Sequence, residues 1–333
     1  MVTSPSGPLT IMWCGIASRA HVLYGAAWIR KMMVNSGTPE AIIGVTKPRS
    51  FLGTPAVTLD DIRTALPISA TVSPWEDGHY PGAGPIWCLS VGAVGIKPWF
   101  RLQASHWRTR VPVVVTDEGL GSYGTWRSRR EAWRRQGVHE PWRSLRTAAV
   151  STATRSLTSE RWALHEETSA GWALNQDIVD EFRLLGTRSA PTRKAVFLSQ
   201  PWPELGVLSE NAYLSHVAEV ADVCVRAGLE FSVHPHPAEH PRRYSAWSTM
   251  EKRPLAELDH GAINAAVVIG MSSTALINLA AIHHTPVMRI TTPELSKLDE
   301  KLSPRQASLL LHHAGPSVDS KAWPSTLTRM LAT

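Results

Sequence analysis

The sequence predicts an α/β protein made of two domains, each built on an open parallel sheet. Short apolar segments rich in β-branched residues alternate with segments of helix length along the chain. This alternation begins again after a polar segment with a proline, residues 187–194, which we interpret as a linker. The length of 333 residues is sufficient for two domains that each have a core.

The first half of the chain has the pattern of βαβ units. We expect a helix over residues 20–33 and strands over residues 9–16, 41–45, 85–92 and 111–119. Glycine, proline or aspartate bounds these strands. Parallel strands need a crossover connection, usually a helix, so this spacing predicts a parallel sheet.

The second half of the chain repeats the pattern. Strands are expected over residues 194–201, 229–235, 265–270 and 285–290, and helices over 210–228 and 273–284. The first helix ends at a glycine and the second begins at a serine, which are favoured residues at those ends. We therefore predict domains over residues 1–188 and 189–333. Ligands of open parallel sheets bind outside the carboxyl ends of the strands, so we expect both sheets to face a central cleft.

Composition excludes several classes of protein. With 43% hydrophobic and 19% charged residues, the chain is neither disordered nor fibrous. It has no apolar run of about 20 residues that could span a membrane, and its first residues do not resemble a signal peptide, so we expect a cytoplasmic protein. Cys14, Cys88 and Cys224 are odd in number and far apart in apolar surroundings, which indicates buried thiols.

An acidic pair followed by glycine, Asp117-Glu118-Gly119, ends the strand predicted over 111–119. A partly desolvated carboxylate has a raised pKa and can act as a general base, while glycine allows a substrate to approach the backbone. A turn with an acid that caps a helix would produce the same residues.

The segment "VHPHPAEH", residues 233–240, holds three histidines and a glutamate. His234 and His236 share one side of an extended segment, because strand side chains alternate. The prolines forbid the helix of an HExxH zinc site, so a metal is disfavoured. An imidazole fixed at the edge of a cleft could donate to a phosphate, and an exposed polar loop is the other interpretation. Glu239 and His240 are expected at the surface.

Ser272, Ser273 and Thr274 open the last predicted helix. Hydroxyls and unpaired backbone N–H groups at the N-terminus of a helix form a natural seat for an anion, although plain N-capping is compatible with the same residues. Gln200 ends the first strand of the second half and either lines the cleft or belongs to a loop.

Taken together and in this order, the three motifs resemble those of the bacterial sialyltransferases and polysialyltransferases. The matching residues are Asp117-Glu118-Gly119, His236-Pro237 and Ser272-Ser273. His234 stands where those enzymes often have lysine. The resemblance implies a GT-B fold, with two Rossmann-like domains facing a cleft. It also implies an inverting, metal-independent transfer from a CMP-activated sugar, normally CMP-sialic acid, with no cofactor.

The resemblance also implies roles for the residues. Glu118 or Asp117 would deprotonate the acceptor hydroxyl, with Glu118 favoured, and His236 would stabilise or protonate the leaving phosphate. The residues expected to bind the donor are Gly119, Gln200, His234, Pro237, Ser272, Ser273 and Thr274. Dipoles at the helix N-terminus would replace a divalent metal.

Residues 126–146 form the strongest charge bias in the chain, with seven arginines against two glutamates and three interleaved tryptophans. We expect this patch to contact a glycan acceptor, anionic or lipid-linked, or the inner face of a membrane. A solvated helix is the other interpretation. Nucleic acid is not expected, because no recognised binding module accompanies the patch. The patch residues are Arg127, Arg129, Arg130, Arg134 and Arg135.

Other functions fit parts of the same pattern. A GT-B transferase could use CMP-Kdo, a UDP- or GDP-sugar or CDP-glycerol as its donor. A protein without catalytic activity could use the arginines to hold an anionic glycan.

Overall fold

The structure is a computed structural model that describes residues 7–51, 54–55, 57–75, 84–135, 137–240, 242–249, 255–319 and 321–332. The contacts within the chain divide it into two compact units. Unit 1 comprises Met1–Glu167 and Ala173–Glu181, and unit 2 comprises Thr168–Trp172 and Phe182–Thr333. After the short segment Thr168–Trp172, the chain enters unit 2 for the second time at Phe182, upstream of the boundary predicted at 188/189.

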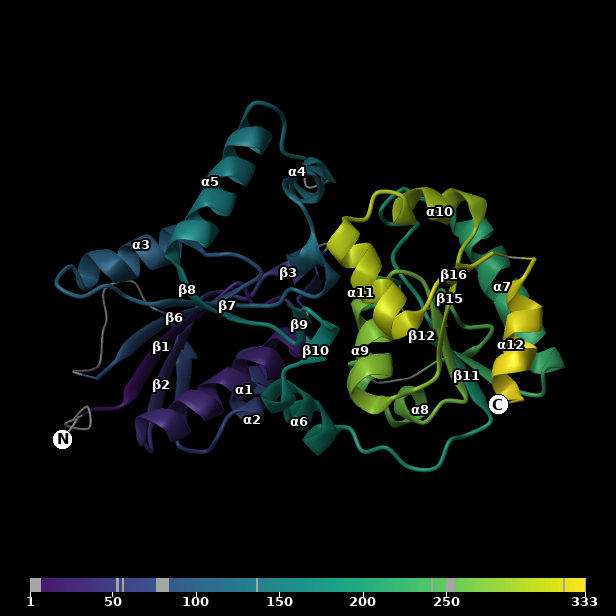
Figure 1. Cartoon of the computed structure of the whole chain (residues 1–333), viewed down its shortest axis with the longest axis horizontal. Coiled ribbons are helices and arrows are strands. Elements are labelled where there is room, and N and C mark those ends of the chain that lie inside the picture. The colour runs from purple at the N-terminus through teal and green to yellow at the C-terminus, as the bar shows by residue number, and fades with distance from the viewer. Residues whose placement is uncertain are drawn as a thin grey trace. The chain divides into compact units, whose positions relative to one another are not determined.

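Unit 1 is built on a six-stranded parallel sheet in the order β5-β2-β1-β6-β7-β8 (Figure 1). Numbered along the chain, this order is 3-2-1-4-5-6, which is that of a Rossmann fold. The strands are β1 (Leu9–Cys14), β2 (Ala41–Val45), β5 (Ala70–Pro74), β6 (Ile86–Val91), β7 (Val113–Thr116) and β8 (Thr158–Trp162).

Helices cover both faces of this sheet (Figure 1). The helices of unit 1 are α1 (Arg19–Ser36), α2 (Leu59–Ala65), α3 (Ile96–Ser105), α4 (Trp126–Arg135), α5 (Trp142–Leu157) and α6 (Gln176–Leu185), and α6 runs on into unit 2. Short two-stranded sheets are formed by β3 (Ser50–Phe51) with β4 (Thr54–Pro55) and by β9 (His165–Thr168) with β10 (Gly171–Leu174), and η1 (Leu120–Tyr123) is a 3₁₀ turn.

Unit 2 repeats the same topology in an independent sheet, with the order β13-β12-β11-β14-β15-β16 and every neighbouring pair parallel. The strands are β11 (Lys194–Leu198), β12 (Glu230–His234), β13 (Ser248–Thr249), β14 (Val267–Gly270), β15 (Val287–Ile290) and β16 (Ser317–Val318). The helices are α7 (Glu210–Arg226), α8 (His260–Ile263), α9 (Thr274–His283), α10 (Pro293–Asp299), α11 (Pro304–Ala314) and α12 (Trp323–Leu331), with the 3₁₀ turn η2 (Ala256–Leu258).

Alternation along β11 explains why helices lie on both faces of the second sheet. Phe197 packs in a cluster with residues of α7 and α12, whereas its neighbours Val196 and Leu198 pack in another cluster with residues of α8, α9 and α11. Strands that are buried on both faces are apolar throughout, which is why these segments could be recognised in the sequence. The prediction of two Rossmann-like parallel sheets is confirmed.

The three cysteines are free thiols, and all are buried, as predicted. Within the described ranges, no helix has both the length and the apolar character that crossing a bilayer requires.

Candidate active site

The acidic motif lies at the carboxyl end of β7, where the sequence placed it, but its two acids have different surroundings. Asp117 is 3% exposed and accepts three hydrogen bonds. Its Oδ2 accepts from the Tyr123 hydroxyl at 2.5 Å and from the Leu164 N–H at 3.2 Å. Its Oδ1 accepts from Arg161 at 3.3 Å. Burial raises the pKa of Asp117, and Arg161, Tyr123 and Leu164 oppose the rise. These bonds make Asp117 an anchor of the strand end.

Glu118, the next residue, keeps an exposed surface. Its carboxylate packs over Gly92, where an added Cβ atom would lie 2.5 Å from Oε2. The enclosing protein raises the pKa of Glu118, and the positive charges of Arg49 and Arg129 oppose that rise. A carboxylate that is reachable from solvent and has a raised pKa suits a general base.

The backbone around Glu118 is fixed by its neighbours. The hydroxyl of Ser122 accepts the N–H of Glu118 at 2.7 Å. Gly119 has φ = 92°, a backbone conformation that residues other than glycine rarely adopt. His21 of α1 accepts the N–H of Ala17 at Nδ1 and hydrogen-bonds the backbone of Glu118. Burial lowers the pKa of His21 to about 4, so this imidazole is neutral. The sequence carried no signal for His21, because its role depends on the packing of α1.

The His-Pro motif follows β12 in a loop that is tied to the end of β11. His236 donates its N–H to the Ser199 hydroxyl at 3.0 Å and to Glu239 Oε2 at 2.8 Å. Its ring Nδ1 accepts the N–H of Ala238 at 3.1 Å. When Nδ1 accepts a hydrogen bond, a neutral imidazole carries its proton on Nε2. The half-buried His236 therefore has a defined ring orientation and a defined donor atom.

Glu239 was predicted at the surface, and this prediction is wrong. The residue is 3% exposed, and its carboxylate accepts hydrogen bonds from Ser199, from Tyr244 at 2.6 Å and from the backbone of His236. Burial raises its pKa, while these bonds and Arg243 oppose the rise. The sequence around Glu239 contains no pattern that predicts its burial by the loop. His240 is exposed, as predicted.

His234 ends β12 opposite Leu198 of β11 and is buried. Its Nε2 lies 3.8 Å from Oδ2 of Asp259. It is the last residue of the strand and directly precedes the loop that carries His236.

The two serines also differ. Ser272 donates its hydroxyl to Asp299, which is paired with Arg289 at 2.7 Å. Arg289 also approaches the Ser272 oxygen at 3.3 Å. Ser273 is the N-cap of α9, yet its side chain makes no capping hydrogen bond. Ser273 and the first N–H groups of α9 are thus the better placed donors for an anion, and Ser272 belongs to a side-chain network.

Gln200 lies just beyond the end of β11. Its backbone N–H donates to Tyr213 at 2.9 Å, and its side-chain oxygen Oε1 is buried without a hydrogen-bond partner in the described part of the chain. A buried acceptor without a donor is costly, so a partner outside the chain would stabilise it.

Unit 2 brings together the residues predicted to bind the donor. β11 lies between β12 and β14, and all three run in the same direction, so Gln200, the His-Pro loop and Ser273 follow neighbouring strands at one edge. This edge includes the point where the strand order reverses, between β11 and β14, which is where Rossmann-like sheets bind ligands. Asp117, Glu118 and Gly119 belong to unit 1.

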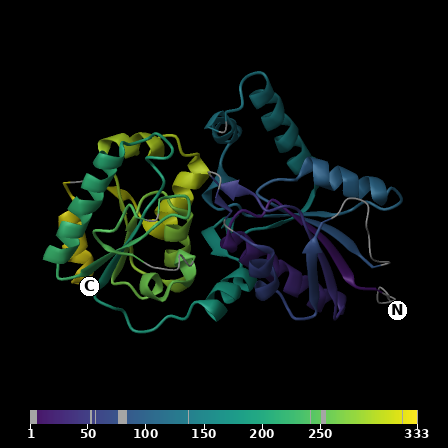
Figure 2. The same cartoon turned by 180° about the vertical axis from the view of Figure 1, so that it is seen from behind.

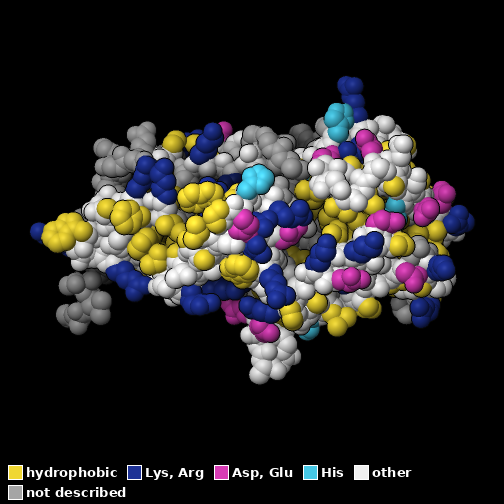
Figure 3. Space-filling view, turned by 90° about the horizontal axis from the view of Figure 1, so that it is seen from above, with side chains coloured by type: hydrophobic (Ala, Val, Ile, Leu, Met, Phe, Trp, Pro, Cys, Tyr) yellow, Lys and Arg dark blue, Asp and Glu magenta, His cyan; other side chains and the backbone are white. Residues whose placement is uncertain are grey.

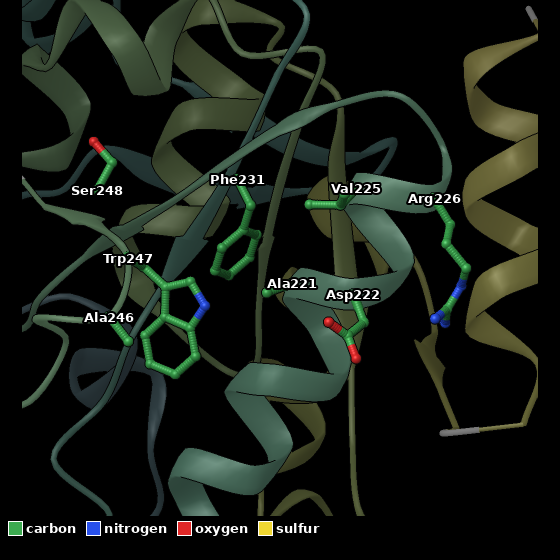
Figure 4. Close-up of a pocket in the computed structure, with 8 residues that line it drawn as sticks. All are labelled: Ala221, Asp222, Val225, Arg226, Phe231, Ala246, Trp247 and Ser248. Carbon is green, nitrogen blue, oxygen red and sulfur yellow. The ribbon is translucent and has the colours of Figure 1, made fainter.

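A groove of about 520 Å³ lies elsewhere in unit 2 (Figure 4). Side chains of α7, including Asp222 and Arg226, line one side, and Phe231 and Trp247 line the other. None of the predicted site residues lines it, so we assign it no part in the site.

The basic patch folds into α4 and the start of α5. Several of its arginines pair with the two glutamates of the patch: Arg130 Nε donates to Glu140 at 2.8 Å, and Arg134 Nε donates to Glu131 at 2.8 Å. Arg127 and Arg129 lie on the same helix, whereas the side chain of Arg135 lies outside the described residues.

The residues that the structure describes contain no group of three or more His, Cys, Asp or Glu side chains that could hold a metal ion. Metal independence itself stays a prediction.

The comparisons with known proteins agree with this reading of unit 2. Residues 177–292 match the model of the alpha-2,8-polysialyltransferase (POLYST) family. The predicted resemblance to the polysialyltransferases is thus confirmed. The match spans the His-Pro loop and the Ser-Ser pair but not the acidic motif, and the roles of these residues within the polysialyltransferase pattern stay predictions. It also supports the predicted enzyme class, a sialyltransferase-like glycosyltransferase. None of the curated proteins that were compared matches the chain.

Two solved structures show the fold. An α/β-galactoside α-2,3-sialyltransferase from the luminous marine bacterium Photobacterium phosphoreum has a TM-score of 0.53 at 8% identity, with 94% of this chain and 98% of that chain covered. A UDP-glucose:anthocyanidin 3-O-glucosyltransferase has a TM-score of 0.51 at 8% identity, with 97% and 90% covered. At such low identity the similarity concerns the fold alone, and the predicted GT-B class is confirmed.

Proposed function

We propose that the protein is an inverting, metal-independent glycosyltransferase that moves sialic acid, or a related nonulosonic acid, from a CMP-sugar to a hydroxyl of a glycan. One observation supports this most: Gln200, His236 and Ser273 follow neighbouring strands at the ligand-binding edge of a polysialyltransferase-like domain. The family match supports glycosyl transfer, and the hydrogen-bond donors at this edge are suited to a donor that carries a phosphate.

The donor phosphate is proposed to lie between His236 and the N-terminus of α9. The Nε2–H of His236 and the Ser273 hydroxyl would donate to its oxygens, together with the first N–H groups of α9. The positive end of the helix dipole stabilises an anion there without a metal. A nucleotide also has amino and hydroxyl donors, and one of these would satisfy the buried Oε1 of Gln200.

Glu118 is proposed as the base. Its carboxylate would take the proton of the acceptor hydroxyl as that oxygen attacks the anomeric carbon from the face opposite the phosphate. The bond between the anomeric carbon and the phosphate oxygen breaks, CMP leaves, and the configuration inverts. His236 would stabilise the charge that develops on the departing phosphate and could deliver a proton to it. Asp117 would position Glu118 through the strand end and is not proposed to touch the substrate.

The acceptor is proposed to be a glycan that is anionic or carried on a lipid. A peripheral membrane contact would bring the enzyme to a lipid-carried acceptor, and the cytoplasmic location stays a prediction.

The test is release of the nucleotide, measured by mass spectrometry across a panel of CMP-, UDP- and GDP-sugars and CDP-glycerol, with EDTA present. We expect CMP from CMP-sialic acid or another CMP-nonulosonic acid. His236→Ala should lower the rate by about 100-fold or more, since general acid–base groups contribute about 10²–10⁴-fold.

His240→Ala is the matched control. His240 belongs to the same loop, and its Nδ1 accepts the N–H of Arg242 at 3.3 Å, yet the residue is exposed. Its removal should leave the rate unchanged. Release of UDP or GDP, or release of CMP from CDP-glycerol, would assign a different donor. The absence of CMP release from every CMP-sugar would overturn the proposal.

A further inference from the structure

The positive charge of this protein is concentrated in one element, the hairpin of helices α4 and α5 over residues 126–157. The hairpin holds eight of the 34 basic residues and two of the 28 acidic residues, a net charge of +6. The whole chain has the same net charge of +6, so the rest of the chain, with 26 residues of each sign, is neutral. A general preference for anions does not explain such a distribution, whereas a docking surface does.

The two acids of the hairpin are already neutralised within it. Glu140 accepts hydrogen bonds from Arg130 and Arg143, and Glu131 accepts from Arg134. Arg130, Ser144 and Arg143 lower the pKa of Glu140 to about 2, so it stays ionised and paired. The net charge that the hairpin presents to a partner is therefore positive.

One face of α5 is apolar and has no covering element among the described residues. Trp142, Leu145 and Ala149 follow one another at helical spacing, and all three are exposed. Trp142 is 65% exposed and Leu145 56% exposed. Thr147 is the single buried residue of this 16-residue helix. A soluble helix usually buries its apolar face, and α5 presents part of it to solvent.

The hairpin projects from unit 1, as the views from front and back both show (Figures 1 and 2). Figure 3 shows the molecule from the side toward which the hairpin projects. On this face, unit 1 carries intermixed hydrophobic and basic side chains. Trp126 adds a further exposed ring at the start of α4, and the Arg130 guanidinium lies 5.5 Å from its centre. Tryptophan beside arginine is typical of the interface between membrane and water.

We propose that the α4–α5 hairpin docks on an anionic lipid bilayer. Trp142 and Leu145 would enter the boundary between headgroups and acyl chains, and the arginines would contact the lipid phosphates. A polyanionic glycan or a nucleic acid would also attract the arginines, but would leave Leu145 without an apolar contact. The bilayer is the one anionic partner that uses both features. This deepens the membrane contact in the proposed function and does not depend on the transfer reaction.

The test is co-sedimentation of the full chain with vesicles, without donor or acceptor. One set is phosphatidylcholine, and the other is equal parts of phosphatidylcholine and phosphatidylglycerol. We expect binding to the second set, and its loss at high salt, because salt screens the arginines. Trp142→Ser combined with Leu145→Ser should weaken binding by about tenfold or more, since burial of large apolar side chains drives insertion.

Leu311→Ser is the matched control, because Leu311 is 59% exposed on α11 in unit 2 and belongs to no basic patch. It should bind like the unaltered chain. Circular dichroism checks that each variant is folded. Arg127→Glu combined with Arg146→Glu should abolish vesicle binding.

Two results would overturn the docking proposal. One is equal binding, or no binding, to both sets of vesicles. The other is that the chain binds a soluble anionic polysaccharide but does not bind vesicles. In that case the arginine variant should lose polysaccharide binding and the Trp142/Leu145 variant should keep it. Because no sugar donor is present, a failure of the transferase proposal would leave vesicle binding unaffected, and the two failures can be told apart.

Discussion

The carboxylate of Glu239 holds the backbone of His236, whose N–H donates to its Oε2 at 2.8 Å. The same carboxylate accepts from Ser199 at the end of β11 and from Tyr244. A buried acid thus joins the His-Pro loop to the central strand of the second sheet. The orientation of the His236 ring depends on this loop, because its Nδ1 is fixed by the N–H of Ala238 two residues later.

Glu239→Ala is predicted to destabilise unit 2 and to lower activity. The change leaves the Tyr244 hydroxyl without this acceptor, leaves the Ser199 hydroxyl with its longer bond to the carbonyl of His234 at 3.3 Å, and removes one partner of Arg243. Leaving a buried donor without its acceptor typically costs about 1–3 kcal/mol. Urea unfolding should show a loss of this size, and kcat should fall more than KM rises because His236 loses its orientation.

Glu210→Ala is the control for this change. Glu210 pairs with the same Arg243, at 3.0 Å, but its side chain is exposed. An exposed pair contributes less than about 1 kcal/mol, so the free energy of unfolding should barely change. Equal losses in the two variants would show that Glu239 is not a special anchor.

Substituting each acid of the acidic motif by its amide should distinguish a catalytic role from a structural one. Glu118→Gln is expected to reduce CMP release by about 10²–10⁴-fold, the range for a general base, with little change in stability. Asp117→Asn leaves an amide among three hydrogen-bond donors, Tyr123, Leu164 and Arg161, and should cost about 1–3 kcal/mol. Initial rates and thermal unfolding of both variants provide the measurement. A fully active Glu118→Gln variant would rule out its role as base.

The pH dependence of kcat/KM should report the raised pKa of Glu118. A general base works when it is deprotonated, so activity should rise with pH through this pKa. The midpoint should lie above the value of about 4.3 for a free glutamate. Arg49 lowers the pKa of Glu118, so Arg49→Ala should move the acidic limb to higher pH and Arg49→Lys should restore it. An unchanged limb in Arg49→Ala would mean that another group controls the profile.

The sequence predicted most of the parallel strands because they are buried on both faces. Their apolar runs stand out, as in "AIIGV" of β2 and "KAVFL" of β11. The edge strands were not predicted: β13 has two residues, and β5 has a single buried residue, Val72, between polar neighbours. Such segments become strands only when a neighbour offers hydrogen bonds.

The motifs located the strand ends but could not assign separate roles to adjacent residues. Asp117 and Glu118 are chemically alike, and only the positions of Tyr123, Arg161 and Gly92 make one an anchor and leave the other reachable. The burial of Glu239 depends on Ser199, which is 40 residues earlier in the chain. Contacts at such separation leave no local pattern in a single sequence.

Ser272 and Ser273 should respond differently to removal of their hydroxyls. Ser273 makes no capping bond and is proposed to contact the phosphate, so Ser273→Ala should weaken CMP binding by about 10- to 150-fold, the loss of one hydrogen bond to a charged group. Ser272 donates to Asp299 beside the buried Arg289, so Ser272→Ala should mainly lower the free energy of unfolding. Calorimetric titration with CMP and urea unfolding measure the two effects separately. The opposite result would be weaker CMP binding in Ser272→Ala and unchanged binding in Ser273→Ala. Ser272 would then have to leave Asp299 when the nucleotide binds, and the phosphate site would include Arg289.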